Sequence, residues 1–295
     1  MNLLSRRYHK VPEAANPKVA KESKLSTFID KLRQRWSDHN SLLCVGLDPD
    51  YSKLPQHLKS EDDPVFAFNR GIIDATTDLV CAYKPNIAFY SGQSAEASLL
   101  RTVDYIHEKY PDIPVVLDSK RGDIGNTARM YAREAFEIFK ADAVTVSPYL
   151  GGDTLQPYSE YRECGVIVLV RTSNPGSGDL QDLEVNGEKL SHIVARKCVT
   201  DWNENGNICA VVGATYPEEL GVIRKIVGDM PLLIPGIGAQ GGGAQAVVQN
   251  GCDSRGQGML INSSRGIIFA SDGTDFAEQA RLKALELRDS INAYR

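Results

Sequence analysis

A short charged segment, residues 118–123 (Asp-Ser-Lys-Arg-Gly-Asp), contains the side chains of this chain that are best suited to chemistry. It follows an apolar run and precedes a helix-like stretch, so it is predicted to be the end of a strand and the turn after it. Because side chains alternate between the two faces of a strand, Asp118 and Lys120 point the same way. Two carboxylates, Asp118 and Asp123, then flank one ammonium in a charge array typical of a catalytic site. The alternative is a solvated loop with a surface ion pair, which contributes little to stability.

A second segment is suited to binding an anion. Residues 235–243 (Pro-Gly-Ile-Gly-Ala-Gln-Gly-Gly-Gly) follow a predicted strand and lead into a helix. Glycines let the backbone approach a ligand closely, and a helix N-terminus offers unpaired N–H groups to an anion. At the end of the next predicted strand, Arg265 supplies a guanidinium suited to bidentate phosphate contact. A glycine cluster alone is usually a turn, but the two features together predict a phosphate site.

Composition places the chain among globular proteins. Its 295 residues are 42% hydrophobic, enough for a substantial core, and the formal net charge is −5. No block of like charge suggests nucleic acid or a membrane surface as a partner, and no apolar run reaches membrane-spanning length. Residues 1–24 are rich in Lys and Arg but lack the apolar core of a signal peptide. They are predicted to be a short flexible leader, with a transit peptide as the alternative.

The side chains that most often bind metals are scattered. The six cysteines form no Cys-x-x-Cys pair, and the five histidines show no paired spacing. The cysteines are therefore predicted to be buried thiols in a reducing compartment, which favours a cytoplasmic protein. Neither a metal site nor a bound cofactor is expected.

Short apolar, β-branched runs recur along the chain. They predict eight strands, at residues 42–48, 80–86, 114–120, 143–148, 165–173, 208–214, 231–238 and 258–264. Helices are predicted between and after them, at residues 63–79, 95–110, 126–139, 190–202, 217–227, 243–250 and 275–291. Strand–helix alternation implies parallel strands joined by right-handed crossovers. Eight such units predict an α/β fold, a single (β/α)8 TIM barrel that forms one catalytic domain over residues 25–295.

A doubly wound open sheet is the alternative to a closed barrel. The glycine fingerprint of that fold should follow the first strand, where residues 47–50 read Leu-Asp-Pro-Asp instead, so the barrel is preferred. The chain shows no internal repeat and no inter-domain linker. Its one long stretch without predicted structure, residues 174–188, has the length of an active-site lid.

The active site of a TIM barrel lies at the C-terminal ends of its strands. Polar residues at those ends are therefore predicted to converge, although they are far apart in the sequence. They are Asp48, Lys84, Asn86, Asp118, Lys120, Ser173, Gln240 and Arg265.

These residues carry a resemblance to a known family. From about residue 42 to about residue 268 the chain resembles the orotidine 5′-phosphate decarboxylases, in particular the longer bacterial-type branch with the motif Asp-x-Lys-Arg-Gly-Asp-Ile-Gly-x-Thr. The resemblance rests on six motifs at six predicted strand ends. They are residues 46–48 (Gly-Leu-Asp), 83–86 (Tyr-Lys-Pro-Asn), 118–127, 172–175 (Thr-Ser-Asn-Pro), 235–240 and 264–266 (Ser-Arg-Gly).

The resemblance implies a role for each matched residue. Lys120 would be the proton donor, and Lys84, Asp118 and Asp123 would complete an alternating charge tetrad. Asp123 and Thr127 would reach the active site of the partner in a homodimer with shared sites. Asp48 would hold the ribose hydroxyls, Ser173 the pyrimidine, and Gln240 and Arg265 the phosphate. The residues implied to bind substrate are Asp48, Asn86, Thr127, Ser173, Pro235, Gln240 and Arg265.

Simpler interpretations exist for three of these residues. Thr127, like its neighbour Asn126, is also placed to cap the helix that begins near it. Lys84 is also compatible with a strand-end lysine whose ammonium extends to solvent. Ser173 is also compatible with turn chemistry before an Asn-Pro pair.

The implied reaction is the cofactor-independent decarboxylation of orotidine 5′-phosphate to uridine 5′-phosphate, the last step of de novo pyrimidine nucleotide synthesis. It leaves an electron pair on a ring carbon with no adjacent π-system, so pre-organised charge must stabilise a localised carbanion. Neighbouring carboxylates favour the protonated form of Lys120, which could then deliver the proton.

Three rival functions remain open. Metal-dependent sugar-phosphate decarboxylases and aldolases of the same superfamily share the Asp-x-Lys-x-x-Asp pattern, but they carry a carboxylate in place of Lys84. A class I aldolase needs a neutral lysine, which two flanking carboxylates disfavour. A phosphate-ligand sensor without catalytic activity is the non-enzyme alternative.

Overall fold

The computed structural model describes residues 27–237 and 243–295, so the predicted leader lies outside the described residues. Eight parallel strands form one sheet in the order β2-β1-β10-β9-β8-β5-β4-β3. Parallel bridges from Tyr83 to Val115 and from Asn86 to Asp118 join the two outer strands and close the sheet into a barrel. The predicted (β/α)8 barrel is confirmed. Its strands are β1 (Leu43–Leu47), β2 (Ala82–Pro85), β3 (Val116–Arg121), β4 (Ala143–Val146), β5 (Gly165–Arg171), β8 (Ile208–Val212), β9 (Leu232–Pro235) and β10 (Met259–Ser263).

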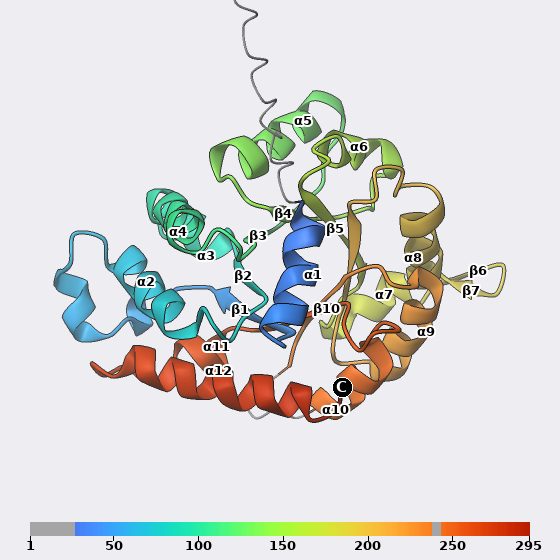
Figure 1. The fold of residues 1–295 in the computed structure, drawn as a ribbon. Helices are drawn as coiled ribbons and strands as arrows, with labels where there is room; N and C mark the ends of the chain where they lie inside the picture. Colours follow the sequence, from blue (N-terminus) through green and yellow to red (C-terminus); the bar gives the residue numbers. More distant parts are fainter. Residues whose placement is uncertain (1–26, 238–242) are drawn as a thin grey trace, which may run out of the picture.

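Helices surround the strands on the outside of the barrel (Figure 1). The longer ones are α2 (Pro64–Thr76), α4 (Glu96–Lys109), α5 (Gly125–Arg133), α8 (Leu190–Thr200), α9 (Pro217–Val227), α10 (Ala244–Gly251) and α12 (Phe276–Asn292). Short helical segments at strand ends are α3 (Ala88–Ser91), α6 (Gln156–Ser159) and α11 (Arg265–Ile268). None of the helices described combines the length and the apolar character that a bilayer crossing requires.

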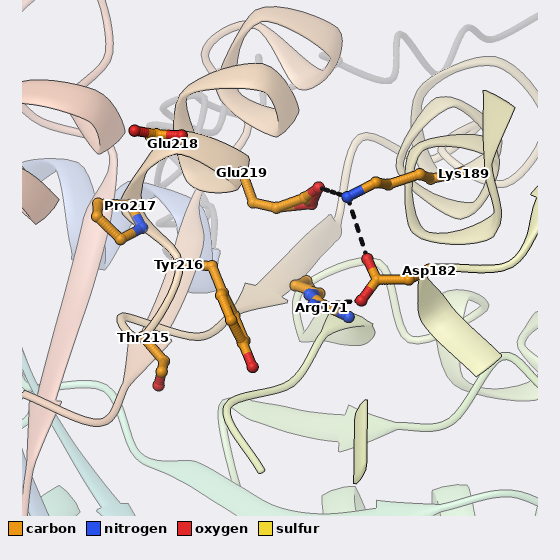
Figure 2. Close-up of a pocket in the computed structure, with 8 residues that line it drawn as sticks. All are labelled: Arg171, Asp182, Lys189, Thr215, Tyr216, Pro217, Glu218 and Glu219. Carbon is orange, nitrogen blue, oxygen red and sulfur yellow. Dashed lines mark hydrogen bonds and ion pairs between the residues drawn. The ribbon is translucent and has the colours of Figure 1, made fainter. Parts of the chain in front are cut away.

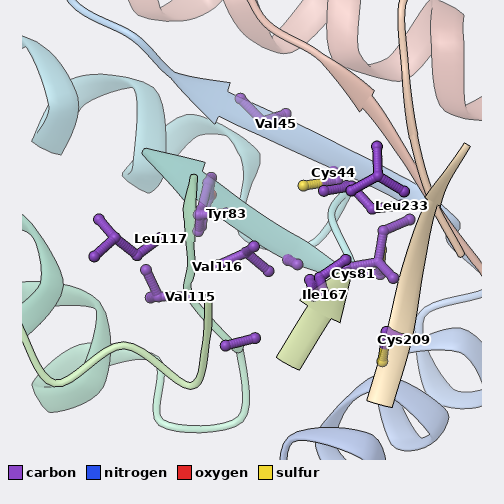
Figure 3. Packing of buried hydrophobic residues seen from close by; sticks show 14 of the residues in the cluster. Cys44, Val45, Cys81, Tyr83, Val115, Val116, Leu117, Ile167, Cys209 and Leu233 are labelled. Carbon is purple, nitrogen blue, oxygen red and sulfur yellow. The ribbon is translucent and has the colours of Figure 1, made fainter. Parts of the chain in front are cut away.

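Three cysteines lie in the apolar core between or beside the strands. Cys44, Cys81 and Cys209 are fully buried among aliphatic side chains, as Figure 3 shows. Burial raises the pKa of the Cys81 thiol to about 12, because the thiolate would lose its hydration. All six cysteines are free thiols, as predicted, although Cys164 and Cys252 are only half-buried.

A helix that was not predicted from the sequence, α1 (Phe28–Asp38), covers the N-terminal end of the barrel. A capping box between Thr27 and Asp30 starts it. The Phe28 ring packs so closely on the first residue of β5, Gly165, that any Cβ there would collide with it. Figure 1 shows α1 in front of the middle of the barrel. The barrel is thus closed at this end, and the opposite end is left for a site.

The segment between β5 and α8 contains short elements, although residues 174–188 were predicted to have no regular structure. It contains a 3-10 turn (Pro175–Ser177), α7 (Gly178–Gln181) and an antiparallel pair of two-residue strands, β6 (Glu184–Val185) and β7 (Glu188–Lys189). The prediction was wrong because Gly, Ser, Asn and Asp also form tight turns, which here close short elements.

Candidate active site

Four side-chain donors surround the carboxylate of Asp118 at the C-terminal end of β3. Its Oδ2 accepts hydrogen bonds from Lys84 Nζ at 2.9 Å and from Asn86 Nδ2 at 3.3 Å. Its Oδ1 accepts from Lys120 Nζ at 2.6 Å and from the Thr145 hydroxyl at 3.0 Å. Strands β2, β3 and β4 each contribute to this cluster. The predicted convergence of Lys84, Asn86, Asp118 and Lys120 is therefore present.

The charges of this cluster hold one another in the ionised state. Burial alone would raise the pKa of Asp118, but Lys84 and Lys120 outweigh it and hold that pKa well below its usual range. Burial likewise would lower the pKa of Lys84, and the charges of Asp118 and Asp48 raise it above its usual range instead. The contribution of Asp118 to stability is present above the ordinary aspartate pKa of about 4 and is lost as the pH falls further. The ion pair is thus intact near neutral pH.

The members of the cluster differ in their access to solvent. The side chain of Lys84 is 4% exposed and that of Asp118 is 10% exposed, whereas that of Lys120 is 48% exposed. Lys120 is thus the member of this cluster that a ligand at the barrel mouth can reach most readily.

A cavity of about 450 Å³ opens beside this cluster, between the ends of β1, β9 and β10. Asp48 and Arg265 both line it, and Asp48 Oδ1 accepts a hydrogen bond from the backbone N–H of Asn86 at 3.1 Å. The end of β1 and the end of β10 approach closely here, since a Cβ on Gly46 would lie 2.7 Å from Ser264 Cβ. Phe89, Gly236 and Asn262 complete much of the lining. A carboxylate and a guanidinium therefore share one cavity, as a ribose and a phosphate site would require.

Ser173 lies near the end of β9. A Cβ on Gly236 would lie 3.7 Å from Ser173 Cβ, and the backbone of Gly213 packs against Ser173 directly. Pro235 is the last residue of β9. Gln240, the predicted phosphate ligand on the following loop, lies outside the described residues. Ser173 and Pro235 are thus on the predicted face of the barrel.

Asp123 and Thr127 follow β3 but do not join the cluster around Asp118 within a single chain. Asp123 Oδ1 accepts a hydrogen bond from the N–H of the next residue, Ile124, at 2.8 Å. Thr127 is exposed in the first turn of α5. No side chain caps that helix, so the capping alternative for Thr127 is wrong.

A network of ion pairs anchors the segment that carries Ser173. Arg171, the last residue of β5, donates to Asp182 at 2.9 Å, and Lys189 bridges Asp182 and Glu219 on α9. Figure 2 shows this arrangement around a second cavity, of about 450 Å³. Only Ser177 is buried among residues 172–189, so apolar packing contributes little to holding this segment. Polar contacts therefore position it.

Comparison with known proteins agrees with this geometry. A sequence model of the family described as "Orotidine 5'-phosphate decarboxylase / HUMPS family" matches residues 41–280. An orotidine 5′-phosphate decarboxylase of Dechloromonas aromatica is 57% identical over 269 residues, covering 91% of this chain and 100% of that protein. One of Cellvibrio japonicus is 55% identical over 271 residues, covering 91% and 99%. The chain belongs to this family.

A solved structure supports the family membership at the level of the fold. The OMP decarboxylase of Leishmania donovani superposes on this chain with a TM-score of 0.78 at 38% identity, covering 91% of this chain and 98% of that one. The two chains therefore share the barrel architecture.

Two polar residues near the family motifs were missed in the sequence. Thr145 is the only polar residue of β4, and Asn262 follows the three apolar residues that begin β10. Both lie in strands whose residues are all buried. A polar residue inside a mostly apolar strand was the feature of the sequence that could have identified them, because a buried polar group needs a hydrogen-bond partner. Within the described residues, no group of three or more His, Cys, Asp and Glu side chains could hold a metal ion.

Proposed function

We propose that this protein decarboxylates orotidine 5′-phosphate to uridine 5′-phosphate, and that the residues matched by the family motifs carry the reaction. The observation that supports this most directly is the array of Lys84, Asp118 and Lys120 at the ends of β2 and β3. It lies at the same end of the barrel as Asp48 and Arg265, which line a cavity large enough for a nucleotide's ribose and phosphate. The named relatives carry the same activity in their names.

The proposed step uses only groups of the protein. The bond between the ring carbon and the carboxylate breaks, carbon dioxide leaves, and the electron pair stays on the ring carbon. The ammonium of Lys120 stabilises that charge as it develops and then transfers one proton to the carbon. Solvent returns the proton to Lys120, whose side chain is half exposed. Asp118 orients Lys120 through a 2.6 Å hydrogen bond.

The metal-dependent sugar-phosphate enzymes are the second candidate. In this chain the ammonium of Lys84 lies 2.9 Å from Asp118 Oδ2 and is buried. A divalent cation bound to Asp118 would meet this fixed positive charge at short range, where repulsion in a partly desolvated site is strong. We therefore favour the metal-independent reaction.

Purified protein should convert orotidine 5′-phosphate to uridine 5′-phosphate at the same rate with and without EDTA. The absorbance change of the pyrimidine gives the rate, and chromatography identifies the product. Sensitivity to EDTA that added Mg²⁺ reverses would contradict the metal-independent step. Absence of uridine 5′-phosphate with folded protein would contradict the proposed function, and sugar phosphates with Mg²⁺ would then be tested.

The active form is proposed to be a homodimer in which Asp123 and Thr127 complete the partner's site. The segments after β3 and β4 carry exposed apolar side chains, namely Ile124, Met130, Tyr149 and Leu150, with exposed fractions between 47% and 78%. Exposed apolar clusters of this kind are typical of protein interfaces. Asp123 directly precedes Ile124, and its carboxylate accepts a hydrogen bond from the N–H of that residue.

Mixing two inactive variants tests the shared site. Lys120→Ala and Asp123→Ala chains should recover activity on subunit exchange, because a mixed dimer contains one site with both residues intact. The measurement is turnover after exchange has been verified with differently tagged chains. Recovery should be absent when either variant is mixed with itself. Verified exchange without recovery would contradict the shared site.

The cytoplasm is the proposed location. All six cysteine thiols are free, and four of them are buried. A reducing compartment keeps thiols in this state.

A further inference from the structure

The strand that carries the charge array is irregular where it meets its neighbour. Leu117 of β3 pairs with Val144 of β4, but the next pair joins Arg121 to Val146. Three residues of β3, numbers 118–120, therefore lie opposite the single residue Thr145. Such a bulge removes regular ladder hydrogen bonds, so the backbone N–H groups of Ser119 and Lys120 need another acceptor.

The hydroxyl of Thr145 supplies this acceptor. Thr145 Oγ1 accepts from Ser119 N at 3.0 Å and from Lys120 N at 2.9 Å. It donates its own hydrogen to Asp118 Oδ1 at 3.0 Å. Thr145 is 1% exposed, so water has little access to these groups. One buried hydroxyl thus contacts all three residues of the bulge.

The bulge places Lys120 in a backbone conformation that is unusual for lysine. Its φ is +49°, in the left-handed region that residues with a Cβ rarely adopt. Such strain persists only where surrounding contacts over-determine it, and it concentrates at functional sites. In this conformation, Lys120 Nζ donates a hydrogen bond to the carboxylate of Asp118, two residues earlier in the chain. The contact that holds the Lys120 N–H is the one made by Thr145.

We propose that Thr145 is a positioning residue for the reaction: its hydroxyl holds the bulge and so fixes Asp118 and the Lys120 ammonium relative to the substrate. The inference rests on the proposed decarboxylation. It assigns to β4 a part in catalysis although Thr145 is not among the residues that line the substrate cavity. Small displacements of a proton donor have large effects on rate, because the reacting atoms must approach closely.

Thr145→Val tests the proposal, since valine keeps the shape and removes the hydroxyl. We expect kcat to fall roughly a hundredfold. KM should change little, because Asp48 and Arg265 belong to the ends of other strands. Thr102→Val is the matched control. Thr102 is also fully buried on α4, donates to the Ser98 carbonyl at 2.7 Å and accepts from Asn69 Nδ2 at 3.0 Å, and neither partner belongs to the cluster around Asp118. Its variant should lose stability and keep the wild-type kcat.

A second pair of variants covers the case in which Thr145→Val does not fold. Thr145→Ser retains the hydroxyl and Thr145→Ala does not, while both lack the methyl group. Thr145→Ser should restore most of kcat, and Thr145→Ala should behave like Thr145→Val. Thermal melting of each variant and the affinity for uridine 5′-phosphate accompany the kinetics, so that misfolding is separated from misplacement.

The outcomes are distinct. A kcat that tracks melting temperature equally in the Thr145 and Thr102 variants would overturn the inference, as would a Thr145→Ser enzyme no better than Thr145→Ala. Failure of the wild-type protein to release uridine 5′-phosphate contradicts the proposed function itself. A selective loss of kcat in the variants without the hydroxyl supports the positioning role.

Discussion

Replacement of Lys120 by alanine lowers kcat for decarboxylation by at least about 10⁴-fold, the combined effect expected from losing a general acid and a charge that stabilises the carbanion. Lys120 is the half-exposed member of the array, and its ammonium lies 2.6 Å from Asp118. Uridine 5′-phosphate should still bind, because Asp48 and Arg265 are unchanged. Steady-state turnover and product inhibition measure the two effects separately.

The chain offers a close control for this substitution. Lys140 also has a positive φ, +53°, and its ammonium lies 2.8 Å from Asp104. It precedes β4, at the opposite end of the strand from the bulge. Lys140→Ala should therefore keep the wild-type kcat. Near-normal turnover by Lys120→Ala would show that another group donates the proton.

Removal of the phosphate from the substrate is expected to lower kcat/KM by at least about four orders of magnitude, or about 5.4 kcal/mol of transition-state stabilisation. The phosphate is remote from the reacting carbon, so its binding energy serves orientation and closure of the site rather than bond breaking itself. The ratio of kcat/KM for orotidine 5′-phosphate to kcat/KM for orotidine gives this loss directly. A loss below about tenfold, or about 1.4 kcal/mol, would contradict this use of the phosphate.

Arg265→Ala separates phosphate recognition from general damage to the site. Arg265 lines the same cavity as Asp48 at the start of α11. The substitution should lower kcat/KM for the phosphorylated substrate and leave that for orotidine unchanged. An equal loss with both substrates would mean that Arg265 supports the fold of the cavity instead.

The positions of the strands along the chain, and of their ends, could be predicted from the sequence because the patterns that indicate them are local. Each apolar run predicts its own strand, and the alternation with helices predicts parallel pairing. This information was sufficient to predict that three charged residues converge, namely Lys84, Asp118 and Lys120. The resemblance to the family added roles for them, and the family membership is confirmed.

Other parts of the site depend on contacts between distant segments. The helix α1 packs against Gly165, far along the chain, and its own sequence gives no sign of that partner. The anchoring of residues 172–189 depends on Glu219, on a helix beyond the next barrel strand. Lys120 pairs with Asp118, whereas Asp123 accepts from the N–H of Ile124, and the motif of six residues does not indicate this difference.

Local patterns in the sequence were enough to predict the barrel, its strand ends and the chemical types of the residues there, because each element carries its own apolar periodicity. The contacts that hold those residues in place arise between elements and are visible only in the folded chain. The two-residue offset between β3 and β4 exists only when the strands pair. It leaves the backbone N–H groups of Ser119 and Lys120 without ladder partners, and the hydroxyl of Thr145, 26 and 25 residues away, accepts from both. Backbone hydrogen bonding must be completed in three dimensions, and this requirement set the geometry of Lys120.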